Sequence, residues 1–517
     1  MESLVNAALV GSARASLDEA LPTGSPEGTL VGALTAETVE QRLLLAAGVR
    51  AIYRLAGYMP ARMDTPLEPA PAETKTVCPA PVADLIHQLF TSRAHDLLAE
   101  ALERMNAARL ILPPEMVPLV LDSATTAQRP LVAQVVGERG AWLGNFNAAW
   151  AWVRNAQAHQ LDELPTDADT IWQEGTSADR LQVLARWRAT DPAKARDEIA
   201  AVWRQEKADF RAELVKALAA RLAPDDEPLL ESALDDRSAS VRAIAQQLLA
   251  RIPGSAYTRR AASRADALLA LNRKKLVATP PAEHEKIWER DGIVAKARQG
   301  TGERSWWLMQ LIAVTPPAHW VERFGMSPAD LIAAATDEHG SDVLEGWSRA
   351  AVLYEAADWA APLIAAWSKR LGKRHKGEIS PQDMCEMLLP ALPRAALEAM
   401  ALRILEHGES KQDIAWETVV GALPRPWSAA FARAWLAGLR KCARELSSLK
   451  SYAPEWWQCS EEQALVLPGE CLDEALAPWD IDEKGKAWQA LTWREQHDRF
   501  LKAVRLRQRI RDEIPGG

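Results

Sequence analysis

The chain has 517 residues, of which 48% are hydrophobic and 25% are charged, and its formal net charge is −9. This composition supplies enough apolar side chains for a sizeable core and argues against disorder along the whole chain. The acidic balance disfavours a general nucleic-acid binder, which would carry a basic domain or stripe. Five scattered cysteines without a CxxC motif support neither a disulfide framework nor a zinc ribbon.

The sequence shows no segment that would direct the chain to a membrane or out of the cell. Residues 1–10 contain Glu2 and no basic residue, unlike a secretory signal. No apolar run reaches the roughly 20 residues that are needed to span a bilayer. Scattered thiols that stay reduced fit a cytoplasm. We therefore expect a cytoplasmic protein that does not enter a membrane.

Helical spacing of apolar residues dominates the first third of the chain. Residues 4–9 and 39–55 are predicted to be helices, and a Pro-rich stretch at 60–81 is predicted to be a long extended connection. Further helices are predicted at 82–90, 94–108, 116–123 and 127–138. We assign residues 1–155 to an N-terminal helical region that includes the Pro-rich loop.

Residues 156–275 contain the clearest repeats. Short amphipathic helices follow one another with very short loops, so they must pack antiparallel. Since no single pair buries its own apolar face, neighbouring pairs are expected to stack into an α-solenoid.

The remaining residues, 276–517, keep the helical patterning without a strict period and form a C-terminal helical region. Helices are predicted there at 306–314, 329–336, 343–356, 361–371, 381–389, 394–407, 429–446 and 493–514. No Asn-Gly or Asp-Gly hairpin lies between alternating apolar runs, so strands are predicted to be negligible. The fold class is therefore predicted to be all-α, with irregular helical parts on either side of the solenoid.

The stretch 236–245 resembles the inter-helix turn and second helix of a HEAT repeat, in which an Asp in the turn and an Arg after a Val are characteristic. Four residues occupy the matching places, Asp236, Val241, Arg242 and Ala245. We expect Asp236 to accept backbone amides at the start of the second helix. Arg242 is expected to reach the turn of a neighbouring repeat. Val241 and Leu249 are predicted to be buried between helices.

Three segments, 9–14, 139–143 and 225–255, are similar to segments of a bacterial family of unknown function. Genes of that family tend to lie near genes for a SWIM zinc-finger protein, a MoxR-type AAA+ ATPase and a von Willebrand factor A domain protein. The resemblance therefore implies AAA+ ATPase and von Willebrand factor A proteins as partners. It implies no activity and no catalytic residues.

Motifs for known chemistry are not found. The sequence has no GxxxxGK[ST] P-loop, no HExxH zinc motif and no GxSxG nucleophile elbow. Cys385 lies among Met and Leu residues at helical spacing and is expected to be a core thiol. The acidic run 225–227 is explained by a helix start, where carboxylates complement the helix dipole. We expect no cofactor and no metal, although a site assembled from distant residues stays open.

Tryptophan is unusually frequent, with 21 residues against six phenylalanines and five tyrosines. Two interpretations are open. The indoles can be stacking platforms for bases or sugars, or the frequency can follow from the codon bias of a GC-rich genome. The many alanines and arginines favour codon bias.

Two basic clusters are candidate docking points for an anionic or acidic partner. The first contains Lys373, Arg374 and Lys376, after a predicted helix end. The second contains Arg260, Lys274 and Lys275. Each also fits the commoner case of a solvated surface, because cations near a helix C-terminus complement the dipole.

These observations favour a non-catalytic adaptor or scaffold that binds partner proteins through a helical-repeat surface. The alternative is a HEAT-like nucleic-acid-binding protein or DNA-repair glycosylase, with a basic concave groove along the phosphate backbone. A third possibility is an enzyme whose site is assembled from distant helices. Because the net charge of −9 counts against the second class, we expect protein partners and no binding to nucleic acid.

Overall fold

The protein is largely helical and forms two compact units. The computed structural model describes residues 8–9, 11, 26–56, 67–91, 95–158, 164, 167–371, 380–410, 413–448, 457, 459–482 and 488–514. Helices account for 68% of the residues and strands are few, which confirms the predicted all-α class. The units are Met1–Ala70 and Pro71–Gly517. The division predicted at 155 and 275 stays a prediction.

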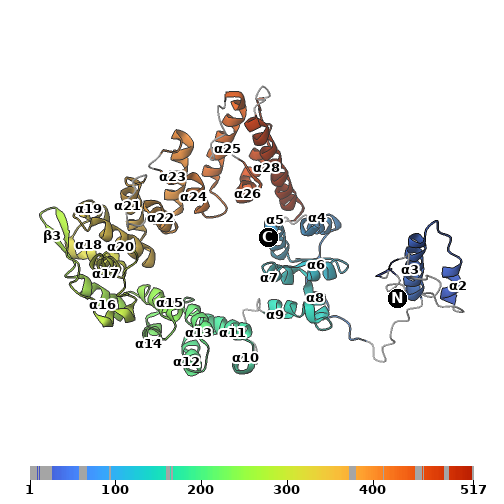
Figure 1. Ribbon diagram of the computed structural model, residues 1–517, viewed down its shortest axis with the longest axis horizontal. Coiled ribbons are helices and arrows are strands. Elements are labelled where there is room, and N and C mark those ends of the chain that lie inside the picture. The colour runs from blue at the N-terminus through green and yellow to red at the C-terminus, as the bar shows by residue number, and fades with distance from the viewer. Residues whose placement is uncertain are drawn as a thin grey trace. The chain divides into compact units, whose positions relative to one another are not determined.

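The first unit has two helices in its described part, α2 (Pro26–Gly32) and α3 (Val39–Ala56), which pack against each other (Figure 1). Val31 and Ala46 are buried between them. Elsewhere α3 leaves apolar side chains exposed, among them Leu44, Leu45, Ile52 and Leu55. The helix predicted at 39–55 is confirmed, whereas only residues 8 and 9 of the one predicted at 4–9 are described, and both are helical.

The second unit begins with a cluster of short helices. Its elements are β1 (Thr76–Val77), α4 (Ala80–Thr91), α5 (His95–Ala107), β2 (Leu110–Ile111), α6 (Val117–Ser123), α7 (Arg129–Val135), α8 (Gly137–Leu143), η1 (Ala148–Trp150) and α9 (Trp152–Ala158). The two-residue strands β1 and β2 pair in parallel. A helix is present where 127–138 was predicted, but its predicted end is wrong: α7 ends at Val135, and Gly137, with φ of 64°, starts the separate helix α8.

The part of the Pro-rich connection that the structure describes contacts the cluster of short helices through Glu73. Residues 67–75 belong to no helix or strand, as predicted, while 60–66 lie outside the described residues. The two carboxylate oxygens of Glu73 accept hydrogen bonds from the amides of Glu138 and Arg139, at 2.9 and 3.0 Å. Glu73 therefore caps α8. A Cβ on Gly137 would lie 2.3 Å from the same carboxylate, so the cap requires glycine there.

The middle of the second unit is a run of paired helices with its own apolar core. Its elements are α10 (Ala168–Glu174), α11 (Ser177–Thr190), α12 (Pro192–Val202), α13 (Ala208–Ala217), η2 (Pro224–Asp226), α14 (Glu227–Ala233), α15 (Ala239–Ala250) and α16 (Ala256–Ala265). Val241 and Leu249 on α15 are both 0% exposed, which confirms their predicted burial, and Ala245 is buried with them.

A β-hairpin follows this run. Strand β3 (Leu269–Asn272) pairs antiparallel with β4 (Lys275–Ala278). The patterning did not predict it, because the turn contains no glycine. Arg273 instead takes the left-handed conformation, with φ of 58°.

The rest of the second unit is helical. Its elements are η3 (Lys286–Asp291), α17 (Glu303–Ala313), α18 (Pro317–Phe324), α19 (Pro328–Ala334), α20 (Gly340–Leu353), α21 (Ala357–Ser368), α22 (Pro381–Leu388), η4 (Leu389–Ala391), α23 (Arg394–His407), α24 (Trp416–Gly421), α25 (Ala429–Arg444), η5 (Leu446–Ser448), α26 (Glu461–Val466), η7 (Gly469–Cys471), α27 (Leu472–Leu476) and α28 (Trp488–Glu513). The last helix lies beside α4 and α5 (Figure 1). Ile510 and Ile514 are buried in the cluster that those helices form.

Many of the tryptophans lie in the core. The most deeply buried are Trp187, Trp320, Trp347, Trp359, Trp435 and Trp493. The rings of Trp347 and Trp359 have their centroids 5.2 Å apart. Indoles packed in this way contribute large apolar area to the core. At these positions they offer no exposed platform for stacking.

Candidate functional site

The turn before α15 is built around Asp236. Its Oδ1 accepts a hydrogen bond from the amide of Ser238 at 2.8 Å, as predicted. The same carboxylate forms a bidentate pair with Arg211 of α13, at 2.7 and 2.9 Å. Burial alone would raise the pKa of Asp236, but hydrogen bonds from Arg211 and the Ser238 amide lower it overall. The turn is thus tied to the preceding helix by a charged pair.

Arg242 does not reach a neighbouring pair of helices, so that prediction is wrong. Its Nη1 donates to the carbonyls of Asp236 and Arg237, at 2.7 and 3.0 Å, within its own turn. Side chains on a helix lean toward its N-terminus. Arg242 lies in the first turn of α15, so the nearest free carbonyls belong to the loop just before it.

A buried ion pair that the sequence did not reveal joins α11 to the start of α14. Two guanidinium nitrogens of Arg188 each lie 2.9 Å from an oxygen of Asp226, and both side chains are 0% exposed. Asp226 also accepts from the amide of Ala223 and from Arg196. The sequence explains the acidic run at 225–227 as a helix start and gives no sign of this ion pair. The pairing partner lies 38 residues away, and no local pattern marks it.

Arg260, predicted to bind a partner, is used inside the fold. It lies 2.7 Å from Asp291 and 3.1 Å from Glu231, and Arg264 also contacts Asp291 at 2.6 Å. Burial alone would raise the pKa of Asp291, but hydrogen bonds from the two arginines lower it overall. Arg260 therefore has two internal carboxylate partners, and its charge is already balanced.

Lys274 and Lys275 stand at the exposed tip of the β3–β4 hairpin, beside Arg273. All three side chains are exposed, and in the described part of the chain no hydrogen bond or ion pair holds any of them. The other predicted cluster, Lys373, Arg374 and Lys376, lies outside the described residues. The structure therefore separates the second predicted cluster into an internal arginine and an exposed tip.

A groove runs between the paired helices and the end of α20. Its volume is about 520 Å³, and it is lined by Glu213, Lys216, Ala219, Ile244, Gln247, Leu248, Arg251, Val352, Leu353 and Glu355. Apolar side chains from α15 and α20 form part of the lining. Charges of both signs also line it, and Arg251 lies 3.6 Å from Glu355. The groove thus combines an apolar surface with charged groups of both signs.

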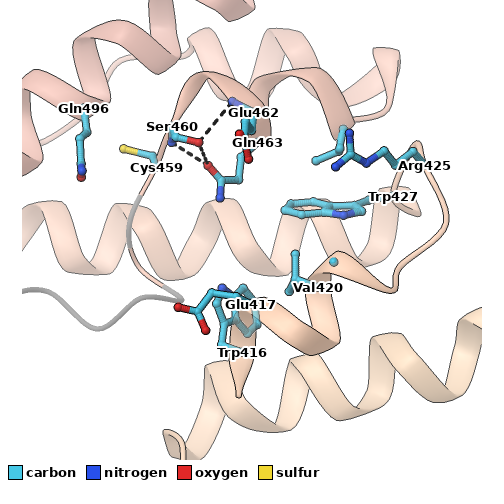
Figure 2. Close-up of a pocket in the computed structure, with 12 residues that line it drawn as sticks. Trp416, Glu417, Val420, Arg425, Trp427, Cys459, Ser460, Glu462, Gln463 and Gln496 are labelled. Atoms are coloured by element: carbon cyan, nitrogen blue, oxygen red, sulfur yellow. Dashed lines mark hydrogen bonds between the residues drawn. The ribbon is translucent and has the colours of Figure 1, made fainter. Parts of the chain in front are cut away.

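Figure 2 shows a second cavity, of about 310 Å³, between α24, the loop at 425–427 and α26. Trp416 and Trp427 line it, yet each is only 3% exposed. Both rings contact Phe431, with centroids 6.4 and 5.0 Å away. The core therefore fixes these indoles in place, and little of either ring face is open to a stacked ligand.

The polar groups of this cavity suit binding better than covalent chemistry. Oε1 of Gln463 accepts from the amide of Ser460 at 2.7 Å, which leaves its Nε2 pointing into the cavity (Figure 2). The Ser460 hydroxyl donates a hydrogen bond to the same oxygen of Gln463. Burial raises the pKa of Cys459, so its thiol stays protonated. A nucleophile needs a lowered pKa or an adjacent base that takes its proton. Neither Cys459 nor Ser460 shows such activation.

The remaining cysteines are also buried, free thiols. Burial raises the pKa of Cys78 and of Cys385 to about 11, and that of Cys442 to about 12. At neutral pH these groups are protonated and weak nucleophiles. Cys385 is 0% exposed, which confirms the prediction that it is a core thiol.

The described residues contain no group of three or more His, Cys, Asp or Glu side chains arranged to hold a metal ion. Among the helices of the same residues, none has the length and apolar character to cross a membrane.

Comparison with known proteins places the chain in a family. No curated protein and no solved structure matches it. One family model matches residues 3–514, which is nearly the whole chain. The chain therefore belongs to DUF5691, a family of unknown function.

Proposed function

We propose that this protein is a non-catalytic scaffold that binds a partner protein in the groove between α13, α15 and the end of α20. The groove itself carries the proposal. Ile244, Leu248 and Leu353 give it apolar lining, and a cavity of about 520 Å³ admits several partner side chains.

An amphipathic helix of the partner fits this groove best. Such a helix lays its apolar side into a groove and keeps its polar flanks in solvent. The charged lining residues form two pairs, Lys216 with Glu213 at 3.7 Å and Arg251 with Glu355 at 3.6 Å. Charges of both signs favour a partner with alternating charges over a polyanion such as DNA.

In this proposal the paired helices α10 to α16 are part of a HEAT-like solenoid that presents the groove. A solenoid of this kind offers an extended surface for partners. In the bacterial family that the sequence resembles, neighbouring genes encode a MoxR-type AAA+ ATPase and a von Willebrand factor A protein. These two proteins are therefore the first partners to test. The complex would form in the cytoplasm.

The test uses a charge placed in the groove and a matched charge elsewhere. Val352 lines the groove and is 39% exposed, and Leu119 on α6 is also 39% exposed. Tagged wild type, Val352→Glu and Leu119→Glu are purified from the native host, and the partners are identified and then reconstituted from pure components. We expect Val352→Glu to weaken binding by at least about tenfold, because it buries a carboxylate in the interface. Leu119→Glu should bind like the wild type.

Two results would contradict the proposal. Undiminished partner binding by Val352→Glu would show that the groove is not the docking surface. Submicromolar, salt-sensitive binding of the wild type to duplex DNA would support the nucleic-acid class instead.

A further inference from the structure

The β3–β4 hairpin is a second surface, distinct from the groove, that extends beyond the helices around it (Figure 1). Its base is firmly anchored. Leu269 at the base is 1% exposed, and Leu276, which lies next to the turn, is 2% exposed. The carboxylate of Asp337 accepts a hydrogen bond from the amide of Ala278 at 2.7 Å. One face of the hairpin is therefore anchored in the core along its length, while the side chains of Arg273, Lys274 and Lys275 remain exposed.

The turn at the tip is made by an unusual residue. Asn272 pairs with Lys275, so Arg273 and Lys274 form a two-residue turn. Arg273 adopts φ of 58°, the left-handed region that Gly, Asn or Asp usually occupies in such turns. A bulky side chain pays a conformational cost there that glycine avoids. Strain of this kind concentrates at functional positions.

Charge is concentrated at the same tip. Arg273, Lys274 and Lys275 are consecutive and exposed, and in the described part of the chain no hydrogen bond or ion pair holds any of their side chains. Arg260, by contrast, has two internal carboxylate partners. Three unpaired cations on one turn repel each other, and an acidic surface would relieve that repulsion.

Apolar side chains flank the cations. Leu271 and Val277 are 41% and 40% exposed. Because they lie on opposite strands at non-paired positions, alternation places them on opposite faces of the hairpin. The tip thus presents cations between two apolar contacts, a combination that suits a protein surface.

We propose that the tip of the β3–β4 hairpin docks onto an acidic segment of a partner protein that also carries apolar residues. Nucleic acid is the less suitable occupant. Tracking a phosphate backbone takes many cations along one face. Here three consecutive cations stand at the tip. At the end of β4, Asp337 carries negative charge, and Arg304 donates to the carbonyls of Pro280 and Pro281. The inference does not depend on the groove.

The first experiment measures binding of a short fluorescein-labelled peptide of alternating Glu and Val by fluorescence anisotropy. The test variant is Lys274→Glu/Lys275→Glu. The matched control is Arg499→Glu/Lys502→Glu on α28, where two exposed cations undergo the same change of charge. We expect the test variant to bind about tenfold more weakly than the wild type and the control to bind like it. Binding should also weaken as ionic strength rises.

The second experiment separates binding from folding. Arg273→Gly removes the strain together with one cation. We expect it to unfold at the same temperature as the wild type or higher, and to bind the peptide about threefold more weakly. Equal peptide binding by all variants, or no peptide binding by the wild type, would overturn the proposal. Tighter binding of a short DNA duplex than of the peptide, lost in Lys274→Glu/Lys275→Glu, would overturn it in favour of nucleic acid. The groove residues are unchanged in all these variants, so the peptide results leave the groove proposal untouched. Submicromolar binding of the wild type to the DNA duplex would count against both proposals.

Discussion

Nε of Arg507 lies 2.6 Å from Oε2 of Glu100, so an ion pair joins residues that are 407 positions apart. Arg507 also donates from Nη1 to the carbonyls of Ala464 and Leu467, both at 2.7 Å. Its side chain is 7% exposed. One arginine of α28 thereby connects α5 near the start of the second unit with the segment at α26.

Replacing this arginine should destabilise the second unit. In Arg507→Met the partly buried Glu100 and two carbonyls lose their donor. We expect the free energy of unfolding to fall by about 3 kcal/mol, because breaking a buried pair leaves an uncompensated charge. Urea denaturation followed by circular dichroism measures the change. Arg509→Met is the control, since Arg509 is 48% exposed, pairs with Glu513 four residues on, and has one further contact, of 3.5 Å, with Gln88. A similar decrease in the free energy of unfolding in both variants would show that the contact between Arg507 and Glu100 does not stabilise the second unit more than an exposed ion pair does.

The pair of Arg188 and Asp226 allows a comparison between adjacent carboxylates. Asp226 is 0% exposed, whereas the side chain of Asp225 is 80% exposed and lies 3.7 Å from Arg196. Asp226→Asn should lower the free energy of unfolding by about 3–5 kcal/mol, because it leaves the Arg188 charge buried without a counter-ion. Asp225→Asn should change it by less than about 1 kcal/mol. Equal urea midpoints for the two variants would contradict the assigned burial.

Leu249 tests the packing of α15. It is 0% exposed, so Leu249→Ala should lower the free energy of unfolding by about 2–5 kcal/mol through lost burial and the cavity that remains. Leu491 on α28 is 50% exposed, and Leu491→Ala should cost less than about 0.5 kcal/mol. An unchanged urea midpoint for Leu249→Ala would show that the side chain is not packed between the helices.

His497 makes stability depend on pH. It is 2% exposed, and its ring stacks on Trp493 with centroids 5.1 Å apart. Burial lowers the pKa of His497 below its ordinary value of 6.5; Asp498 opposes the shift, while Arg440 and Arg505 add to it. As the pH falls through 6.5, the unfolded chain takes up a proton that the folded protein does not, so unfolding becomes more favourable.

We expect the urea midpoint of the wild type to decrease as the pH is lowered from about 7.5 to about 5.5. The decrease should be smaller in His497→Phe, which keeps a ring against Trp493. Because other groups titrate as well, the comparison is the difference between variant and wild type at each pH. His407→Phe serves as the control, since the side chain of His407 is 71% exposed. A pH dependence in His497→Phe equal to that of the wild type would rule out His497 as its source.

The sequence by itself determined the features that depend on neighbours along the chain. The helix at 39–55 follows from apolar spacing within a few turns. Asp236 accepts the amide of Ser238 two residues on, and that bond was predictable from the turn alone. The burial of Val241 and Leu249 followed from the same periodicity, because a helix has only one face to turn toward its neighbours.

Tertiary structure decided which charges are available to a partner. Arg260 and Lys274 looked alike in the sequence, but Arg260 meets Asp291 while Lys274 remains at an exposed tip. The partners of Arg188 and Arg507 lie 38 and 407 residues away. An ion pair depends on which side chains the folded chain brings within a few ångströms, and helical spacing carries no information about contacts between distant elements. For the same reason the groove between α15 and α20, and the hairpin that turns on Arg273, emerge only from the folded chain.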